Sequence, residues 1–254
     1  MPPLRLEDVT SDMLSVLTRG ASQLGVELDD HQLDAFERYY RLLKVASSRF
    51  NLTAVVGYEA VQQRHFLESL ALLPPLREIG LLAPGKAERV LDLGAGAGLP
   101  GLPLKIAAPE LDLTLLEATA RKAAFLREVA AELAMERVEV LAGRAEDVAR
   151  QPDRRAAYDL VLARAVASLP TLVELALPFL HIGGVLATPK GSGARQEAAR
   201  SERVLGLVGG RLLSITTLPV PEAEHQPRLV LVRKVASTPD TYPRRAGIPA
   251  KRPL

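Results

Sequence analysis

Residues 89–101, Arg-Val-Leu-Asp-Leu-Gly-Ala-Gly-Ala-Gly-Leu-Pro-Gly, constrain the fold of this chain more than any other stretch. Residues 90–93 are typical of a short buried strand, and glycines then follow at every second position. Pro100 suits the first turn of a helix, where its missing N–H is not needed. A strand, a glycine turn and a helix start form a crevice in which backbone approaches a nucleotide-like ligand closely.

Charge decides which ligand this crevice favours. Gly96, Gly98 and Gly101 satisfy the G-x-G-x-x-G pattern of dinucleotide-binding loops, so an NAD-linked oxidoreductase is one alternative. Asp92 argues against it, because a carboxylate at the end of the strand would repel a pyrophosphate. S-adenosylmethionine (SAM) carries a sulfonium and an ammonium group and no phosphate. We interpret the stretch as a SAM-binding loop, with a ligand-free glycine turn as the other alternative.

Composition narrows the class of protein. A chain of 254 residues, 48% of them hydrophobic, fits one large domain or one domain with a small partner. The lack of cysteine excludes disulfides, thiolate metal sites and cysteine nucleophiles, and the four histidines show no metal-ligand spacing. Residues 1–12 lack the apolar core of a signal peptide, and no apolar run reaches about 18 residues. We therefore expect a cytoplasmic protein without a metal.

The first 75 or so residues follow a helical pattern. Ser11 or Asp12 can cap a first helix, and Asp29 or Asp30 a second. A third helix is expected over residues 59–73, where two prolines then end it.

Beyond residue 89, short apolar runs alternate with helical stretches. The expected strands are residues 90–93, 113–116, 138–141, 160–163, 185–188, 212–216 and 229–232. The expected helices are residues 102–107, 121–133, 169–180 and 196–208. This alternation predicts an α/β fold with a doubly wound, Rossmann-like sheet, mostly parallel, with the two late strands as an antiparallel edge. The expected parts are an N-terminal helical extension (1–75), a SAM-binding methyltransferase domain (76–238) and a basic Pro/Arg-rich arm (239–254).

Polar side chains that follow the strands are candidates for the site. Glu117 comes after the second strand, where an acid can accept both hydroxyls of a ribose. Ala145 and Glu146 follow the third strand and can border an adenine. Each acid equally fits the N-terminus of a helix. Arg164 ends the fourth strand, so its charge either faces the site or pairs with Asp92 or Glu117.

Two motifs that the sequence lacks reduce the range of possible methyl acceptors. The fourth strand is followed by Ala-Val-Ala-Ser rather than by the Asn/Asp-Pro-Pro-aromatic loop that grips an exocyclic amine. Without cysteine, attack at a pyrimidine C5 through a thiolate adduct is impossible. Guanine N7 needs neither device, because its lone pair is already available. Such a transfer depends on alignment more than on a general base.

Cations suggest a polyanionic partner. The calculated pI is about 9.0, and the last residues carry several cations and no acid. Lys190 follows the fifth expected strand, Arg228 precedes the last one, and Arg244, Arg245 and Lys251 lie in the arm. These residues can contact RNA phosphates, or they are simply solvated. A further alternative is that the arm packs on its own domain, anchored by Tyr242 and Ile248.

Together these stretches resemble the bacterial 16S rRNA (guanine-N7) methyltransferase family, also called glucose-inhibited division protein B. The resemblance is carried by residues 92–103, where Leu-Pro-Gly-x-Pro is more specific than the glycines. It is also carried by residues 51–53, His65 with Ser69, and residues 164–169, 190–191 and 242–249. It runs from about residue 28 to the end, and the role of the earlier residues stays open.

The resemblance implies SAM-dependent methylation of one guanine N7 in a 16S rRNA loop near the decoding site, with S-adenosylhomocysteine as product. The residues expected around SAM are Asp92, Gly94, Gly96, Leu99, Glu117, Ala118, Thr119, Ala145, Glu146 and Arg164. Arg144 and Arg228 match family arginines on the RNA side, and Arg144 and Arg164 are candidates for positioning the acceptor. The substrate is 16S rRNA, the small subunit or an assembly intermediate, with no DNA or membrane partner, and we expect a monomer. A non-catalytic ribosome-assembly factor is the alternative, recognised by SAM binding without methyl transfer.

Overall fold

The computed structural model describes residues 14–254, so the caps proposed at Ser11 and Asp12 and the argument on residues 1–12 lie outside the described residues. The extension begins with α2 (Ser15–Gln23) and α3 (Asp30–Arg49). Asp29 caps α3: its side chain accepts the Gln32 N–H, and the Gln32 side chain accepts the Asp29 N–H. This reciprocal capping box selects Asp29 over Asp30 as the cap.

The expected third helix is three short elements. These are α4 (Tyr58–Val61), the π-helical turn η1 (Gln62–Leu67) and α5 (Glu68–Leu70). The expectation that two prolines end the helix is wrong: Pro74 and Pro75 lie in the first turn of α6 (Leu73–Glu78). The first helical turn has no intrahelical use for its N–H groups, so prolines are tolerated there.

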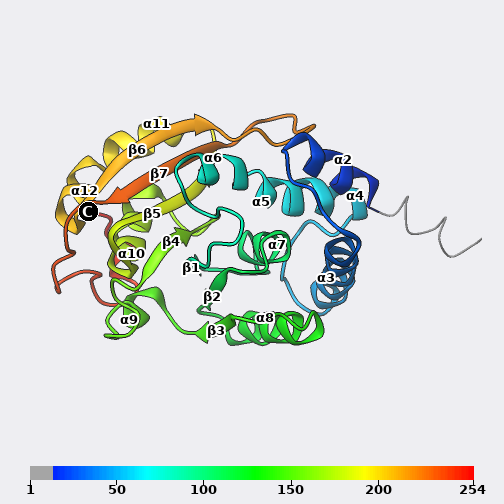
Figure 1. Cartoon of the computed structure of the whole chain (residues 1–254). Coiled ribbons are helices and arrows are strands. Elements are labelled where there is room, and N and C mark those ends of the chain that lie inside the picture. The colour runs from blue at the N-terminus through cyan, green and yellow to red at the C-terminus, as the bar shows by residue number, and fades with distance from the viewer. Residues whose placement is uncertain (1–13) are drawn as a thin grey trace, which may run out of the picture.

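Seven strands form one sheet in the order β3-β2-β1-β4-β5-β7-β6 (Figure 1). The strands are β1 (Arg89–Leu93), β2 (Asp112–Glu117), β3 (Val138–Ala142), β4 (Tyr158–Leu162), β5 (Leu180–Lys190), β6 (Gly210–Thr217) and β7 (Arg228–Lys234). β1 to β5 are parallel, and β7 is antiparallel to both β5 and β6. The predicted doubly wound sheet with an antiparallel edge is confirmed. The strand order reverses at β1, and in such sheets ligands bind outside the carboxyl ends of the strands at that point.

Helices cover both faces of the sheet (Figure 1). The elements between and after the strands are α7 (Gly101–Ala107), α8 (Ala120–Glu132), α9 (Ala145–Val148), α10 (Leu169–Ala176), η2 (Leu177–Phe179), α11 (Ala194–Arg200), α12 (Glu202–Val208) and α13 (Ile248–Lys251). Residues 196–208 were expected as one helix, but the chain breaks at Ser201. The Ser201 hydroxyl donates back to the Glu197 carbonyl, a bond that often bends helices.

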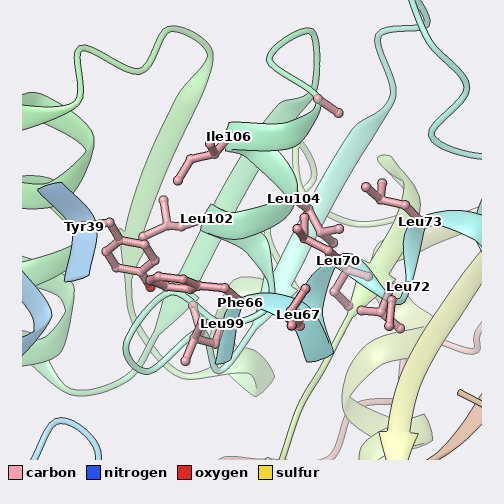
Figure 2. Close-up of a cluster of buried hydrophobic side chains, with 14 of the residues drawn as sticks. Tyr39, Phe66, Leu67, Leu70, Leu72, Leu73, Leu99, Leu102, Leu104 and Ile106 are labelled. Atoms are coloured by element: carbon pink, nitrogen blue, oxygen red, sulfur yellow. The ribbon is translucent and has the colours of Figure 1, made fainter. Parts of the chain in front are cut away.

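Two cores alternate along the strands. On β1, Val90 packs with the N-terminal helices, α7 and α8, whereas Leu91 packs with α10, α11 and α12. Figure 2 shows part of the first core, where Phe66 and Leu67 of η1 lie beside Leu99, Leu102 and other side chains of the α7 region. The helical extension is therefore a continuation of the main core and lies directly against the glycine loop.

The C-terminal arm packs on the domain. Arg155 donates to the carbonyl oxygens of Thr238, Pro239 and Tyr242. Tyr242 is half-buried, as its anchor role requires, whereas Ile248 is exposed and does not anchor the arm. The buried arm residues are instead prolines 243 and 249.

Candidate functional site

The loop after β1 turns on three glycines with positive φ, at Gly94, Gly96 and Gly98. A Cβ on Gly98 would lie 2.2 Å from the Leu102 side chain, so only glycine lets α7 begin this close to the loop. A Cβ on Gly96 would meet nothing nearer than the Gly94 carbonyl at 3.8 Å. The loop is thus closed toward α7 and open at Gly96, where a ligand can approach its backbone.

Asp92 lies near the carboxyl end of β1 and is fully buried. Its Oδ2 accepts the Gly101 N–H at 2.8 Å, and its Oδ1 is buried without a hydrogen-bond partner among the described residues. Burial raises the pKa of Asp92 to about 7, the Glu117 charge adds to this, and Gly101 and Arg164 oppose it. An unsatisfied buried carboxylate is unfavourable and fits a ligand that brings positive charge or a donor.

Glu117, at the end of β2, ties the glycine loop to the start of α8. Its Oε2 accepts the Gly96 N–H at 3.0 Å, and its Oε1 accepts the Thr119 N–H at 2.7 Å. Each carboxylate oxygen keeps a second lone pair, so these bonds leave acceptor capacity for ribose hydroxyls. Ala118 and Thr119 are exposed beside it. The carboxylate is held in place before any ligand arrives.

Sequence reasoning did not single out Tyr39 of α3. Its fully buried hydroxyl donates to the Ala97 carbonyl at 2.6 Å, and its ring stacks on Phe66 with 5.4 Å between centroids (Figure 2). The helical periodicity of α3 places Tyr39 on an inward face, but it does not show what the hydroxyl contacts. The glycine loop is therefore braced from the extension as well as from the sheet.

Arg164 follows β4 by two residues and bridges to the extension. Its Nη2 donates to the Arg64 carbonyl at 2.7 Å and lies 3.2 Å from Glu68 Oε2. The close ion pair of Arg164 is therefore with Glu68 rather than with Asp92 or Glu117. Arg164 Nη1 is buried and has no hydrogen-bond partner within residues 14–254. Glu68 was missed as a partner because residues 68 and 164 meet only in the folded chain.

His65 is a core residue. It is 5% exposed, and its Nε2 lies 2.9 Å from Thr53 Oγ1. Burial, aided by the Arg164 charge, lowers the pKa of His65 to about 4. The imidazole is therefore neutral near pH 7, and it forms a polar contact with Thr53 within the extension.

The loop after β3 holds the next candidates. Glu146 is buried, and its Oε1 accepts the Gly247 N–H of the arm at 2.8 Å. Ala145 is half-buried, and Arg144 is exposed. This contact connects the loop to the C-terminal arm, so one of the Glu146 oxygens has a partner within the protein.

Two adjoining clefts open beyond the carboxyl ends of β4 and β5. The inner cleft, about 530 Å³, is lined by Glu68, Arg164, Ala165, Pro189, Lys190 and Gly191 together with residues 192 and 225–227. The outer cleft, about 620 Å³, lies between η1 and residues 220–227. Glu68, His225 and Pro227 line both clefts. The two clefts therefore adjoin at these three residues.

The basic candidates have different surroundings. Lys190 and Arg228 are register partners on β5 and β7. Lys190 Nζ donates to the Ala167 carbonyl at 2.6 Å and pairs with Glu197 at 3.0 Å. Arg228 is exposed, and it donates to the Thr217 hydroxyl. Of these two cations, Lys190 lines the inner cleft, and Arg228 follows Pro227, which also lines it.

The arm cations divide into two kinds. Arg244 binds Glu174 through its backbone N–H and through Nε and Nη2, at 2.9, 2.9 and 2.7 Å, and Glu174 is fully buried. This geometry gives Arg244 a structural role, because its charge neutralises a buried carboxylate. Arg245 and Lys251 are exposed.

Residues 14–254 contain no helix with the length and apolar character needed to cross a membrane. Over the same residues, no group of three or more His, Cys, Asp or Glu side chains is arranged to hold a metal ion.

The sheet resembles structures of other proteins at low sequence identity. A mutant of MtNAS in complex with S-adenosylmethionine matches with a TM-score of 0.52 and 18% identity, over 91% of this chain and 81% of that one. A branched-chain polyamine synthase from Thermus thermophilus, in complex with N4-aminopropylspermidine and 5'-methylthioadenosine, matches with a TM-score of 0.51 and 17% identity, over 68% and 57%. These likenesses show the fold.

Sequence comparisons are more specific. The ribosomal RNA small subunit methyltransferase G of Dehalococcoides mccartyi (strain ATCC BAA-2100) is 46% identical over 95% of this chain and 100% of that protein. The protein of the same name from Pelotomaculum thermopropionicum is 40% identical over 96% of this chain and 100% of that protein. The model of the GidB family, rRNA small subunit methyltransferase G, matches residues 32–225. The chain therefore belongs to the GidB family of rRNA small subunit methyltransferase G proteins.

Proposed function

We propose that this protein transfers the methyl group of SAM to N7 of one guanine in the small-subunit rRNA. Membership of the GidB family supports SAM-dependent methylation of rRNA. The observation that carries the proposal in the structure is Oδ1 of Asp92, which is buried beside the open glycine loop and has no hydrogen-bond partner among residues 14–254. A carboxylate placed there favours a cationic ligand over a diphosphate.

The residues around the crevice fit SAM. Asp92 would compensate the positive charge of its methionine part, and Glu117 would accept the ribose hydroxyls. The further residues we assign to the pocket are Gly94, Gly96, Leu99, Ala118, Thr119, Ala145, Glu146 and Arg164. When bound, SAM supplies an electrophilic methyl group on its sulfonium. The chain supplies orientation, because Glu117 and Tyr39 fix the loop through backbone groups.

The acceptor needs no proton removed, because the N7 lone pair of guanine is already free. The His65 imidazole is bonded to Thr53 in the core of the extension. Positioning of the base is therefore the main contribution of the chain to the reaction. Arg164, at the carboxyl end of β4, and the exposed Arg144 are the candidates for this role.

The RNA would lie over five cations, of which Lys190 is mostly buried and the other four are exposed. Arg144, Lys190, Arg228, Arg245 and Lys251 are the proposed phosphate contacts, which would set affinity and orientation but carry no base specificity. We propose that the protein acts as a cytoplasmic monomer on 16S rRNA, either free or within a small subunit or its assembly intermediate, and that it does not act on DNA or at a membrane.

Methyl transfer tests the proposal directly. The protein is incubated with methyl-labelled SAM and small-subunit rRNA, and the labelled nucleoside is identified by mass spectrometry after digestion. We expect N7-methylguanosine at one position. Label on a base carbon or a ribose oxygen would contradict the reaction. SAM binding without transfer to rRNA, 30S subunits or assembly intermediates would favour a non-catalytic factor, and NAD binding in place of SAM would favour an oxidoreductase.

A further inference from the structure

The inner cleft has the position expected for the methyl acceptor. It opens beyond the carboxyl ends of β4 and β5 and includes Arg164, whose charge interacts with Asp92 and with Glu68. Asp92 belongs to the crevice of β1, and Glu68 belongs to the extension. Glu68 therefore marks the wall of the cleft that is contributed by the extension, and the charge of Arg164 links this wall to the crevice.

Glu68 is unusual among the groups that line this cleft. Its side chain is 20% exposed. Within residues 14–254 its polar contact is the ion pair between its Oε2 and Arg164 Nη2, which are 3.2 Å apart. Burial raises the pKa of Glu68, while the charges of Arg164 and Arg64 oppose the rise. Within residues 14–254 no backbone or hydroxyl donor satisfies this partly desolvated carboxylate, so it has acceptor capacity left for a ligand.

We propose that Glu68 recognises the target guanine, its carboxylate accepting hydrogen bonds from the N1–H and the exocyclic N2 amino group. This inference rests on the proposed guanine N7 methylation. Guanine is the standard base that presents two adjacent donors on its Watson–Crick edge, and a carboxylate presents two acceptors. Adenine places an acceptor at N1, which a carboxylate repels. N7 lies on the opposite side of the purine and stays free to react.

The same contact favours the reaction itself. Transfer of a methyl cation to N7 leaves the purine positively charged, and the charge makes N1–H a stronger donor. A carboxylate bonded to N1–H therefore binds the transition state more tightly than the neutral guanine. Glu68 thus acts on specificity and on rate together, and a loss of its charge lowers kcat more than it raises KM.

A competing role is possible on the same geometry: Glu68 acts only by holding Arg164. The two roles differ in their response to the N2 amino group. Inosine keeps N1–H, O6 and N7 and lacks that group. If Glu68 bonds to N2, the Glu68→Gln variant has already lost this contact, because its amide cannot accept hydrogen bonds from both N1–H and N2. The variant then discriminates little between guanosine and inosine. If Glu68 only holds Arg164, the Glu68→Gln change and the loss of the N2 amino group lower kcat/KM independently, so their fold-losses multiply.

The experiment uses the full chain and rRNA, with guanosine or inosine at the position that wild type methylates. For wild type we expect kcat/KM to fall about 10- to 100-fold on inosine, as for a site that loses one matched hydrogen bond to a charged group. For Glu68→Gln we expect a loss of about 100-fold or more on guanosine, mostly in kcat, and less than about 3-fold discrimination against inosine. Glu59→Gln, an exposed acid on α4, is the matched control and should behave as wild type.

Two results would overturn the inference. One is equal methylation of guanosine and inosine by wild type, which needs no variant and so holds even if Glu68→Gln folds poorly. The other is an inosine penalty that is the same in Glu68→Gln as in wild type, with unchanged SAM affinity as evidence of folding. Failure of wild type to modify any guanine N7 would instead reject the proposed function.

Discussion

The hydroxyl of Tyr39 donates to the carbonyl oxygen of Ala97 across 2.6 Å, so α3 of the extension holds the glycine loop directly. Both glycines that flank Ala97 have positive φ. A loop of this kind has little conformational preference of its own. The extension therefore contributes to the shape of the crevice although Tyr39 was not among the expected site residues.

Tyr39→Phe keeps the ring and its packing on Phe66 and removes the hydrogen bond. The buried Ala97 carbonyl then loses a partner, so we expect SAM affinity to fall by about 1 kcal/mol, or roughly 5- to 10-fold. Tyr40→Phe on the same helix is the control, because its hydroxyl contacts the Val56 carbonyl only at 3.4 Å. Titration calorimetry measures both variants. Equal SAM affinity in wild type and Tyr39→Phe would mean that the loop is fixed by the sheet alone.

Asp92 should make stability depend on pH. Its folded pKa of about 7 lies above the ordinary value of 3.8. A carboxyl group with a raised pKa stabilises the fold most when protonated, and this contribution is lost as pH rises through 7. Without ligand, Asp92→Asn should melt at a higher temperature than wild type at pH 8, and the difference should shrink toward pH 5.

SAM binding should show the opposite trend at Asp92. The ionised carboxylate attracts the cationic ligand, so wild-type affinity should fall as pH drops below about 7. Asp92→Asn should bind SAM more weakly at pH 8 and should lack that pH dependence. A wild-type affinity that is flat from pH 5 to pH 8 would remove Asp92 from the proposed contact with the ligand charge.

Glu117→Ala should weaken SAM binding by about 1–3 kcal/mol, because charge-assisted hydrogen bonds to the ribose are lost. It also frees the N–H groups of Gly96 and Thr119, which the carboxylate now binds. Glu128→Ala, an exposed acid on α8, controls for a general change of charge. If calorimetry gives wild-type SAM affinity for Glu117→Ala, the carboxylate serves only the two backbone groups.

Two adjacent arginines in the arm should behave differently. Arg244→Ala leaves the buried Glu174 without its cation, so we expect a loss of about 3–5 kcal/mol of unfolding free energy. Arg245→Ala should leave stability unchanged and should reduce the log–log salt dependence of RNA binding by about 0.7–0.9, as for one phosphate contact. Denaturant unfolding and RNA titrations at several salt concentrations measure the two effects. An unchanged salt slope for Arg245→Ala would argue against an RNA contact at that residue.

Local patterns were sufficient to predict most of the sheet. Apolar runs located six of the seven strands within two residues at each end, whereas β5 begins at Leu180, in a stretch that was expected to be helical. The glycine spacing located the turn between β1 and α7, because both signals reside in neighbouring residues. The prediction of one helix over residues 196–208 was wrong. The hydrogen bond from the Ser201 hydroxyl to the Glu197 carbonyl divides this stretch, and the spacing of apolar residues does not reveal such a bond. The two prolines after residue 73 were misread because a proline marks a helix start as readily as an end.

Side-chain partners were harder to predict. Asp92 and Glu117 could be placed at strand ends, where position along the sheet is enough to predict proximity. The Glu68 partner of Arg164 and the Glu174 partner of Arg244 lie 96 and 70 residues away in the chain. Such pairs depend on how helices pack over the sheet, and a single sequence contains no direct signal for that packing.

The π-helical turn η1 has a consequence for chain length. A π-turn holds one residue more than the α-helical turn it replaces, and removing that residue restores a regular helix. Each residue of an α-helix rotates the chain by about 100°. A deletion in a regular α-helix therefore turns the rest of the helix by that angle, whereas a deletion of one residue within η1 is taken up by the wide turn, which becomes an ordinary one and leaves Glu68 facing Arg164. The π-helical turn makes the site tolerant of the loss of one residue at this point in the chain.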